Sequence, residues 1–125
     1  MCGIAGIIGR IGDRNRAALQ RMSDAMVHRG PDGQGTWESP PDAGGFGAML
    51  THRRLAILDV SPAGAQPMKD PVSGQVIVFN GEIYNFPELR DRLVASGQEF
   101  QSTGDTAVLL RALATRGPDA VASLR

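Results

Sequence analysis

The chain has 125 residues, with 13 basic and 13 acidic side chains and a formal net charge of zero at pH 7. This length holds one domain with a real core, and the balanced charge leads us to expect neither nucleic acid nor a membrane surface as a partner. A single cysteine excludes an internal disulfide, and with only two histidines we expect no metal site.

The N-terminal sequence predicts no signal peptide, because it lacks a charged region followed by a long apolar stretch. No apolar run is long enough to cross a bilayer. We therefore expect a cytoplasmic location.

The first part of the chain predicts a strand, a helix and a loop. Residues 2–8 are a short apolar run that predicts a buried strand ended by Gly9. From Asn15 to His28, apolar residues recur at helical spacing and predict an amphipathic helix that covers a sheet. Turn-forming residues fill 28–33, which is either a loop beside a substrate or a simple helix-stopping turn.

The middle of the chain predicts short strands joined by turns. A strand is expected at 35–38, followed by a connector rich in Pro, Gly and Asp. Two further strands are expected at 46–50 and 55–58, separated by the polar run 51–54. The strongest strand signal is 75–79, which is apolar and β-branched.

The last part of the chain predicts helices. Asn85 is the expected N-cap of a helix that ends near Gly97. Thr103 or Asp105 is expected to cap a second helix that stops at Gly117, and a short helix follows. The order of elements predicts an α+β fold with a largely antiparallel sheet.

Cys2, the only cysteine, lies directly after the initiator methionine. Removal of Met1 would leave a thiol and a free α-amino group on one residue. An α-amine titrates near pH 7.7–8.0 and a free thiol near 8.5, so the amine is suited to take the thiol proton. Enzymes with an N-terminal nucleophile use this pairing. The alternative is that Cys2 is an inert apolar residue in a strand.

Six segments in register with this cysteine resemble one family, the class II glutamine amidotransferase domain. Within it they are most similar to the glutaminase half of glutamine-hydrolysing asparagine synthetases. The segments are Met1–Ile4, His28–Asp32, His52–Ile57, Ala65–Met68, Asn80–Asn85 and Thr103–Thr106.

The resemblance implies a layered αββα fold of the N-terminal nucleophile hydrolase type, with antiparallel sheets and helices outside. In that family the glutaminase domain is longer and a synthetase domain follows it. We therefore expect residues 1–125 to be the front part of a glutaminase domain, C-terminally incomplete and without the synthetase domain. Open sheet edges would then favour a homo-oligomer.

The resemblance also implies roles for six residues. Cys2 would supply both nucleophile and base. The Asn80 side-chain amide and the Gly81 N–H would meet the oxyanion, as hydrogen-bond donors do in acyl transfer. Arg54 would bind the α-carboxylate of glutamine, since the family arginine directly precedes Leu-Ala-Ile. The substrate ammonium would be bound by Asp105 and Glu82, the latter through its carboxylate or its backbone carbonyl.

Each of these residues also has a structural interpretation. Asn80-Gly81 is a strong hairpin-turn signal, Asp105 could serve only as a helix cap, and Arg54 could be a solvated cation. His28 and His52 raise the rival hypothesis of a Cys–His pair. Strand alternation sends Arg53 and Arg54 to opposite faces, so only one of them can face the pocket.

The sequence therefore predicts an enzyme that hydrolyses L-glutamine to L-glutamate and ammonia through a γ-glutamyl thioester on Cys2. The ammonia would supply ATP-dependent amidation of aspartate by a synthetase domain or protein. No cofactor is expected for the glutaminase half-reaction, and ATP and Mg²⁺ are expected only in the synthetase part. The alternatives are a catalytically silent glutamine-binding module and the glutaminase domain of another amidotransferase.

Overall fold

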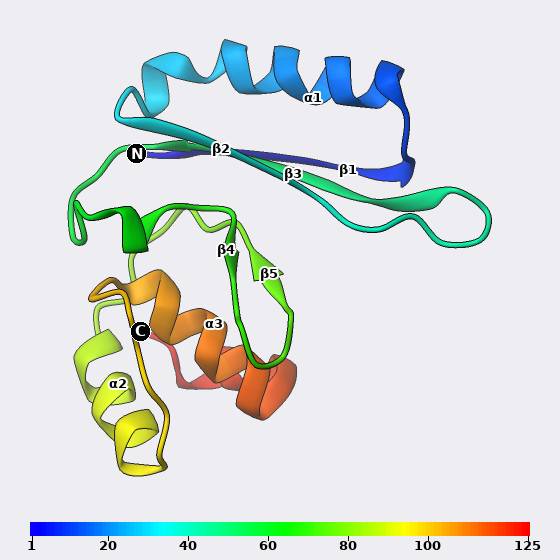
Figure 1. The fold of residues 1–125 in the computed structure, drawn as a ribbon. Coiled ribbons are helices and arrows are strands. Elements are labelled where there is room, and N and C mark those ends of the chain that lie inside the picture. The colour runs from blue at the N-terminus through cyan, green and yellow to red at the C-terminus, as the bar shows by residue number, and fades with distance from the viewer. The chain divides into compact units, whose positions relative to one another are not determined.

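A computed structural model describes residues 1–125, and the chain divides into two compact units (Figure 1). Unit 1 comprises Met1–Ala56, Ala65–Pro67 and Val78–Asn80. Unit 2 comprises Ile57–Gly64, Met68–Ile77 and Gly81–Arg125.

Unit 1 is built on a three-stranded antiparallel sheet with one helix on it (Figure 1). The strands are β1 (Gly3–Arg10), β2 (Gly33–Glu38) and β3 (Phe46–Arg54), in the order β1-β3-β2. Helix α1 (Asp13–Ala25) lies along one face of the sheet and is followed by a 3₁₀ turn at Val27–Arg29. The expected helix over a sheet is confirmed, with its end three residues earlier than the sequence pattern indicated.

Contacts identify the sheet face that α1 covers. Arg53 of β3 donates from Nε to the Ser23 carbonyl and hydroxyl, both at 3.0 Å, and from Nη2 to Asp24 at 2.9 Å. Leu19 of α1 and Met49 of β3 are buried in this layer. Because side chains alternate along a strand, His52 and Arg54 lie on the opposite face.

The opposite face of the sheet carries two short segments of unit 1, 65–67 and 78–80. A Cβ on Gly35 of β2 would overlap the Gln66 carbonyl, so the main chain of 65–67 lies directly on the strand. The Gln66 Oε1 then accepts a hydrogen bond from the Phe79 N–H at 2.6 Å. Residues 78–80 are thereby held beside 65–67.

Gly35→Ala should lower the free energy of unfolding by about 1–3 kcal/mol, because main-chain atoms of Gln66 occupy the space of the new methyl group. Gly9→Ala is the matched control, since no atom lies within 4 Å of its added Cβ. It should change stability by less than about 0.5 kcal/mol. Urea denaturation of both variants measures the difference, and equal values would contradict this packing.

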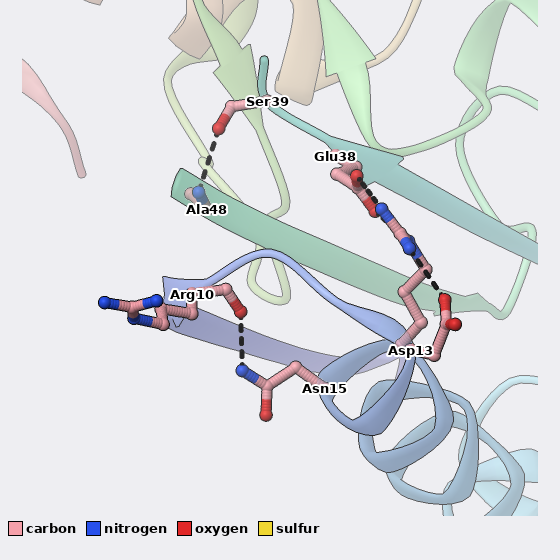
Figure 2. Close-up of polar contacts among 7 residues, drawn as sticks. Arg10, Asp13, Asn15, Glu38, Ser39 and Ala48 are labelled. Carbon is pink, nitrogen blue, oxygen red and sulfur yellow. Dashed lines mark hydrogen bonds and ion pairs between the residues drawn. The ribbon is translucent and has the colours of Figure 1, made fainter. Parts of the chain in front are cut away.

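The edge of unit 1 where α1 begins is closed by polar contacts (Figure 2). The Arg16 guanidinium donates to Glu38 of β2 at 2.7 and 2.8 Å and to Asp13 at 2.9 Å. The Asn15 amide donates to the Arg10 carbonyl at 2.7 Å. These exposed groups fix the entry of the helix and add little stability.

Unit 2 contains two helices, a short hairpin and two 3₁₀ segments, and its helices and hairpin are labelled in Figure 1. The helices are α2 (Phe86–Ala95) and α3 (Asp105–Arg116), the hairpin pairs β4 (Met68–Lys69) with β5 (Val76–Ile77), and Pro62–Gly64 and Gly117–Ser123 are 3₁₀ turns. Its core consists of seven buried apolar residues: Ile83, Leu89, Val108, Leu109, Leu110, Ala112 and Ala120. Asp70 and Arg111 form an ion pair at 2.8 Å that joins the hairpin to α3.

Two strand predictions from the sequence are wrong. Residues 51–54 do not separate two strands, because β3 continues through them, and residues 55–58 form no strand. The reason is pairing on both edges: His52 lies opposite Ile4 of β1 and also opposite Gly35 of β2. A central strand of this kind tolerates polar residues.

The segment 75–79 forms a strand only at Val76–Ile77, since its antiparallel partner β4 has two residues and the Phe79 N–H bonds to a side chain. No strand follows Gly81, so Asn80-Gly81 is not a hairpin turn.

The prediction that the first strand is buried is only half correct, because one face of β1 is exposed. Ile8, on the face away from α1, is 91% exposed.

The helix caps differ from those expected. The N-cap of α3 is Gly104, not Thr103 or Asp105, and Asp105 is the first helical residue. Asn85 occupies the expected N-cap of α2, but its side chain instead bonds the Ser123 carbonyl and the Arg125 N–H, both at 2.9 Å. Gly117 ends α3 as predicted, with a φ of 64° that favours glycine.

The α+β class and the antiparallel pairing are confirmed. None of the helices is both long and apolar enough to span a bilayer.

Candidate functional site

Cys2 lies one residue before β1 and is half-buried. Its Sγ contacts the main chain of Leu55, at 3.3 Å from the amide nitrogen and 3.6 Å from the carbonyl oxygen. Strand β1 pairs Gly3 with Arg53, so the same register continued by one residue brings Cys2 opposite Arg54. The predicted nucleophile and the predicted carboxylate-binding residue therefore lie at the same end of the sheet.

The loop 29–32, which begins at the last residue of the 3₁₀ turn, forms hydrogen bonds with the main chain of both Cys2 and Arg54. Arg29 donates from Nε to the Cys2 carbonyl at 3.0 Å. Asp32 donates its N–H to the Arg54 carbonyl at 2.9 Å, and its carboxylate accepts from the Ala56 N–H at 2.9 Å. Gly30 lies so close to the Arg53–Arg54 peptide that an added Cβ would overlap it. Any of these bonds, once lost, would loosen the strand end that carries Cys2 and Arg54.

The sequence reasoning missed the positioning contacts of Arg29 and Asp32. It interpreted residues 28–33 as a substrate-bordering loop or a helix-stopping turn. Gly30 could have indicated that this loop packs closely against another segment, because glycine has no side chain to keep two backbones apart. Its partner across the sheet end could not be identified from spacing alone.

His52 lies two residues before Arg54 on the same face of β3 and is 1% exposed. Neither ring nitrogen has a hydrogen-bond partner. Burial lowers the pKa of His52, the positive charge of Arg54 lowers it further, and the nearby Phe79 carbonyl opposes both effects. His52 is therefore neutral at pH 7 and lies beneath the site as a buried polar group.

The stability of the protein should fall as pH drops below about 6.5, because the unfolded chain protonates His52 there while the folded chain does not. This loss of stability is absent above the pKa of His52 in the unfolded chain. It stops growing once the pH is below the pKa of His52 in the folded chain. Urea midpoints at pH 7.5 and 5.5 measure it. His52→Gln should reduce the difference, whereas His28→Gln, at an exposed histidine, should not. An unchanged difference in His52→Gln would contradict the assignment.

Asn80 ends unit 1, directly after the Phe79 N–H that Gln66 holds. Gly81 is exposed and begins unit 2. No hydrogen bond within the protein engages the Asn80 side-chain amide or the Gly81 N–H. Both groups have donors to offer a bound molecule.

Asp105 and Glu82 belong to unit 2. Asp105 is 6% exposed, and its Oδ2 accepts a hydrogen bond from the Ile83 N–H at 3.0 Å, while its Oδ1 has a longer 3.5 Å contact with the Thr106 hydroxyl. A trans peptide directs its C=O and N–H to opposite sides, so the Glu82 carbonyl points away from Asp105 Oδ2. The Glu82 side chain is exposed.

Unit 1 thus contains three of the predicted residues. Cys2 and Arg54 lie at one end of the sheet, and Asn80 follows Phe79 on the segment that Gln66 holds. The other three (Gly81, Glu82 and Asp105) belong to unit 2. No group of three or more His, Cys, Asp or Glu side chains is arranged to hold a metal ion. The expectation that the glutaminase half-reaction needs no cofactor stays a prediction.

Comparison with known proteins gives the family of the chain. Residues 1–125 match the family described as "Glutamine amidotransferase domain". The chain is 37% identical over 114 residues to "Asparagine synthetase [glutamine-hydrolyzing] 3" of Bacillus subtilis, which covers 88% of this chain and 17% of that protein. It is 37% identical over 122 residues to "Asparagine synthetase B [glutamine-hydrolyzing]" of Escherichia coli, covering 95% of this chain and 20% of that protein.

A second Bacillus subtilis relative, "Asparagine synthetase [glutamine-hydrolyzing] 1", is 36% identical over 130 residues and covers 100% of this chain and 19% of its own length. The chain therefore spans about a fifth of the length of these relatives. The family match, by contrast, runs from the first residue to the last, and the resemblance carried by the six sequence segments is confirmed. The chain belongs to the glutamine amidotransferase domain family.

Proposed function

We propose that this chain hydrolyses L-glutamine to L-glutamate and ammonia, with the Cys2 thiol as the nucleophile. One observation carries the proposal: Cys2 and Arg54 lie at the same end of one sheet and are fastened by one loop, in a chain of the glutamine amidotransferase domain family. A thiol and a carboxylate-binding cation are the minimal pair for attack on the side-chain amide of an amino acid.

The reaction begins after Met1 is removed. The α-amine of Cys2 takes the thiol proton while Sγ attacks the amide carbon of glutamine, which forms the C–S bond of a tetrahedral intermediate. The C–N bond then breaks, the amine returns its proton to the leaving nitrogen, and ammonia departs. Water hydrolyses the remaining γ-glutamyl thioester, which releases L-glutamate and restores the thiol.

The oxyanion of the tetrahedral intermediate is stabilised by the Asn80 side-chain amide and the Gly81 N–H. Both donors are without partners in the protein, which suits groups that bind charge only in the transition state. The absence of a hairpin at this dipeptide removes the main structural interpretation of Asn80-Gly81.

The charged ends of the substrate are bound by three residues. Arg54 pairs with the α-carboxylate, and alternation along β3 supports it, because Arg53 is bound to Ser23 and Asp24 of α1. Asp105 and Glu82 receive the ammonium. Asp105 binds through Oδ1, since Oδ2 holds the Ile83 N–H, and Glu82 binds through its carboxylate, since its carbonyl points away from Asp105 Oδ2.

We further propose the wider setting of this reaction. The fold is the layered N-terminal nucleophile hydrolase type, which the antiparallel sheet of unit 1 and its covering helix support. The relatives' printed names support delivery of ammonia to a synthetase domain or protein that makes asparagine by ATP-dependent amidation of aspartate. ATP and Mg²⁺ serve that step only. Self-association of this chain also stays a prediction.

The proposal is tested by intact mass after treatment with 6-diazo-5-oxo-L-norleucine, an electrophilic analogue of glutamine. One spectrum reports both removal of Met1 and the number of adducts. A single adduct on Cys2 that excess L-glutamine suppresses is the expected result. Methionine-free protein that stays unlabelled and releases no glutamate would overturn the proposal and favour a silent glutamine-binding module.

A further inference from the structure

A hydrogen-bond network in unit 2 connects a loop residue to the start of helix α3. The Asp59 carboxylate accepts from the Ser102 hydroxyl at 2.7 Å and from the Thr103 N–H at 2.9 Å. The Ser102 hydroxyl oxygen in turn accepts from the Gly104 N–H at 3.1 Å. Gly104 is the N-cap of α3 and Asp105 its first residue. Asp59 is therefore linked to Gly104, the N-cap of α3, through two consecutive hydrogen bonds that share the Ser102 hydroxyl.

The network is packed as well as bonded. Ser102 is buried, and its carbonyl accepts from Arg90 Nη1 of α2 at 3.0 Å. The Cβ of Asp59 would lie 3.5 Å from a Cβ added to Gly104. The segment 102–104 is therefore held from two sides, and the direction in which Asp105 leaves it is fixed.

The same Asp59 carboxylate has a second, local set of partners. It accepts from the Ser61 hydroxyl at 2.6 Å and from the Ser61 N–H at 2.9 Å. Hydrogen bonds from Ser61 and then from Ser102 hold the pKa of Asp59 well below its usual range, so the group is a carboxylate at neutral pH. The Ser102 and Thr103 bonds lead to the start of α3, and the Ser61 bonds to Asp59 close a turn within the loop.

We infer that Asp59 is a positioning residue for Asp105, acting through Ser102, Thr103 and Gly104. It touches no substrate itself. It sets the place of the Asp105 carboxylate, whose Oδ2 holds the Ile83 N–H and whose other oxygen binds the substrate ammonium. This inference rests on the proposed function, because it assigns Asp59 to the substrate-binding part of that site.

An ion pair with the ammonium is present in the ground state and in the transition state alike, so its loss changes binding more than turnover. Asp59→Ala should therefore raise the KM for L-glutamine about tenfold and leave kcat within about twofold. Ser102→Ala, which removes one hydroxyl, should change KM in the same direction by a smaller factor. In an Asp105→Asn background, Asp59→Ala should add nothing further, because the two act as one unit.

Ser61→Ala is the matched control, because the hydrogen bond to Asp59 that it removes lies within the loop. It should leave KM unchanged. An equal KM effect in Ser61→Ala, or a fall in kcat at constant KM in Asp59→Ala, would overturn the positioning role.

Amide hydrogen exchange gives a readout that needs no activity. The N–H groups of Thr103, Gly104 and Ile83 should exchange faster in Asp59→Ala than in the wild type, and at the wild-type rate in Ser61→Ala. The Ile83 N–H is the direct reporter, since its acceptor is Asp105 itself. If the wild-type chain does not hydrolyse glutamine, the proposed function fails. The positioning of Asp105 then stands if Ile83 exchange accelerates in Asp59→Ala, and falls if it does not.

Discussion

Cys2→Ser should reduce glutamine hydrolysis by at least about 10³-fold, the scale at which removal of a nucleophile acts. A serine hydroxyl is far less acidic and less nucleophilic than a thiol, so the α-amine activates it much less effectively in a site built around Cys2. The substitution replaces one small side chain by another, and the hydrogen bonds of Sγ are with the Leu55 main chain, which a hydroxyl can also bond, so the fold should persist. Glutamate release measures the activity, and an unchanged urea midpoint shows that the protein is folded.

A second variant, which keeps a residue ahead of Cys2, separates the two candidate bases. A chain that keeps a residue ahead of Cys2 has an amide nitrogen in place of the amine, and it should lose turnover while its thiol still reacts with iodoacetamide. The structure gives the rival Cys–His pair little support, because Sγ contacts the main chain of Leu55 and both nitrogens of His52 are unpartnered. If His28→Ala or His52→Ala abolished thiol reactivity and blocking the amine did not, the amine mechanism would be wrong.

Local patterns in the sequence predicted the helices well and the strands poorly. The run 51–54 was interpreted as a break because Thr, His and two Arg are polar. Yet two of them have partners in the central strand: the Thr51 hydroxyl donates to the Gly35 carbonyl at 3.1 Å, and Arg53 bonds to Ser23 of α1. Residues 51–54 form a strand because β3 pairs with β1 on one edge and with β2 on the other. The sequence of one segment does not show which strands it will pair with.

The length of β5 shows the same limit in reverse. Residues 75–79 have high β-propensity, but a strand extends only as far as its partner, and β4 has two residues. The Phe79 N–H bonds to the Gln66 side chain instead, and this bond holds the segment that ends at Asn80. A β-propensity scale cannot show that the Gln66 side chain, and not a neighbouring strand, will accept the Phe79 N–H.

For the candidate site, the order of the motifs supplied the residues but not the way they are held. Arg29 bonds a carbonyl 27 positions away, and Cys2 contacts a residue 53 positions away. Such contacts join elements that the chain brings together only on folding. Residue types indicate which chemistry is available, whereas the loop 29–32 and the Asp59 network fix where it takes place.

Asn80→Ala should lower kcat for glutamine hydrolysis by about 10²–10³-fold with little change in KM, the effect of removing one oxyanion donor. The amide meets charge that develops only in the transition state, so substrate binding is spared. Gln66 holds the Phe79 N–H at 2.6 Å directly before this residue, so the main chain cannot readily move another donor into the vacant place.

Asn85→Ala is the matched control for this prediction. It removes the same type of side chain from unit 2, where the amide bonds the Ser123 carbonyl and the Arg125 N–H. Because those bonds are structural, Asn85→Ala should lower the urea midpoint and leave kcat of the folded protein close to wild type, the opposite of the pattern expected for Asn80→Ala. A change in KM alone at Asn80 would assign it to substrate binding. A loss of stability there without a change in kcat would mean that its amide, like that of Asn85, serves only the fold.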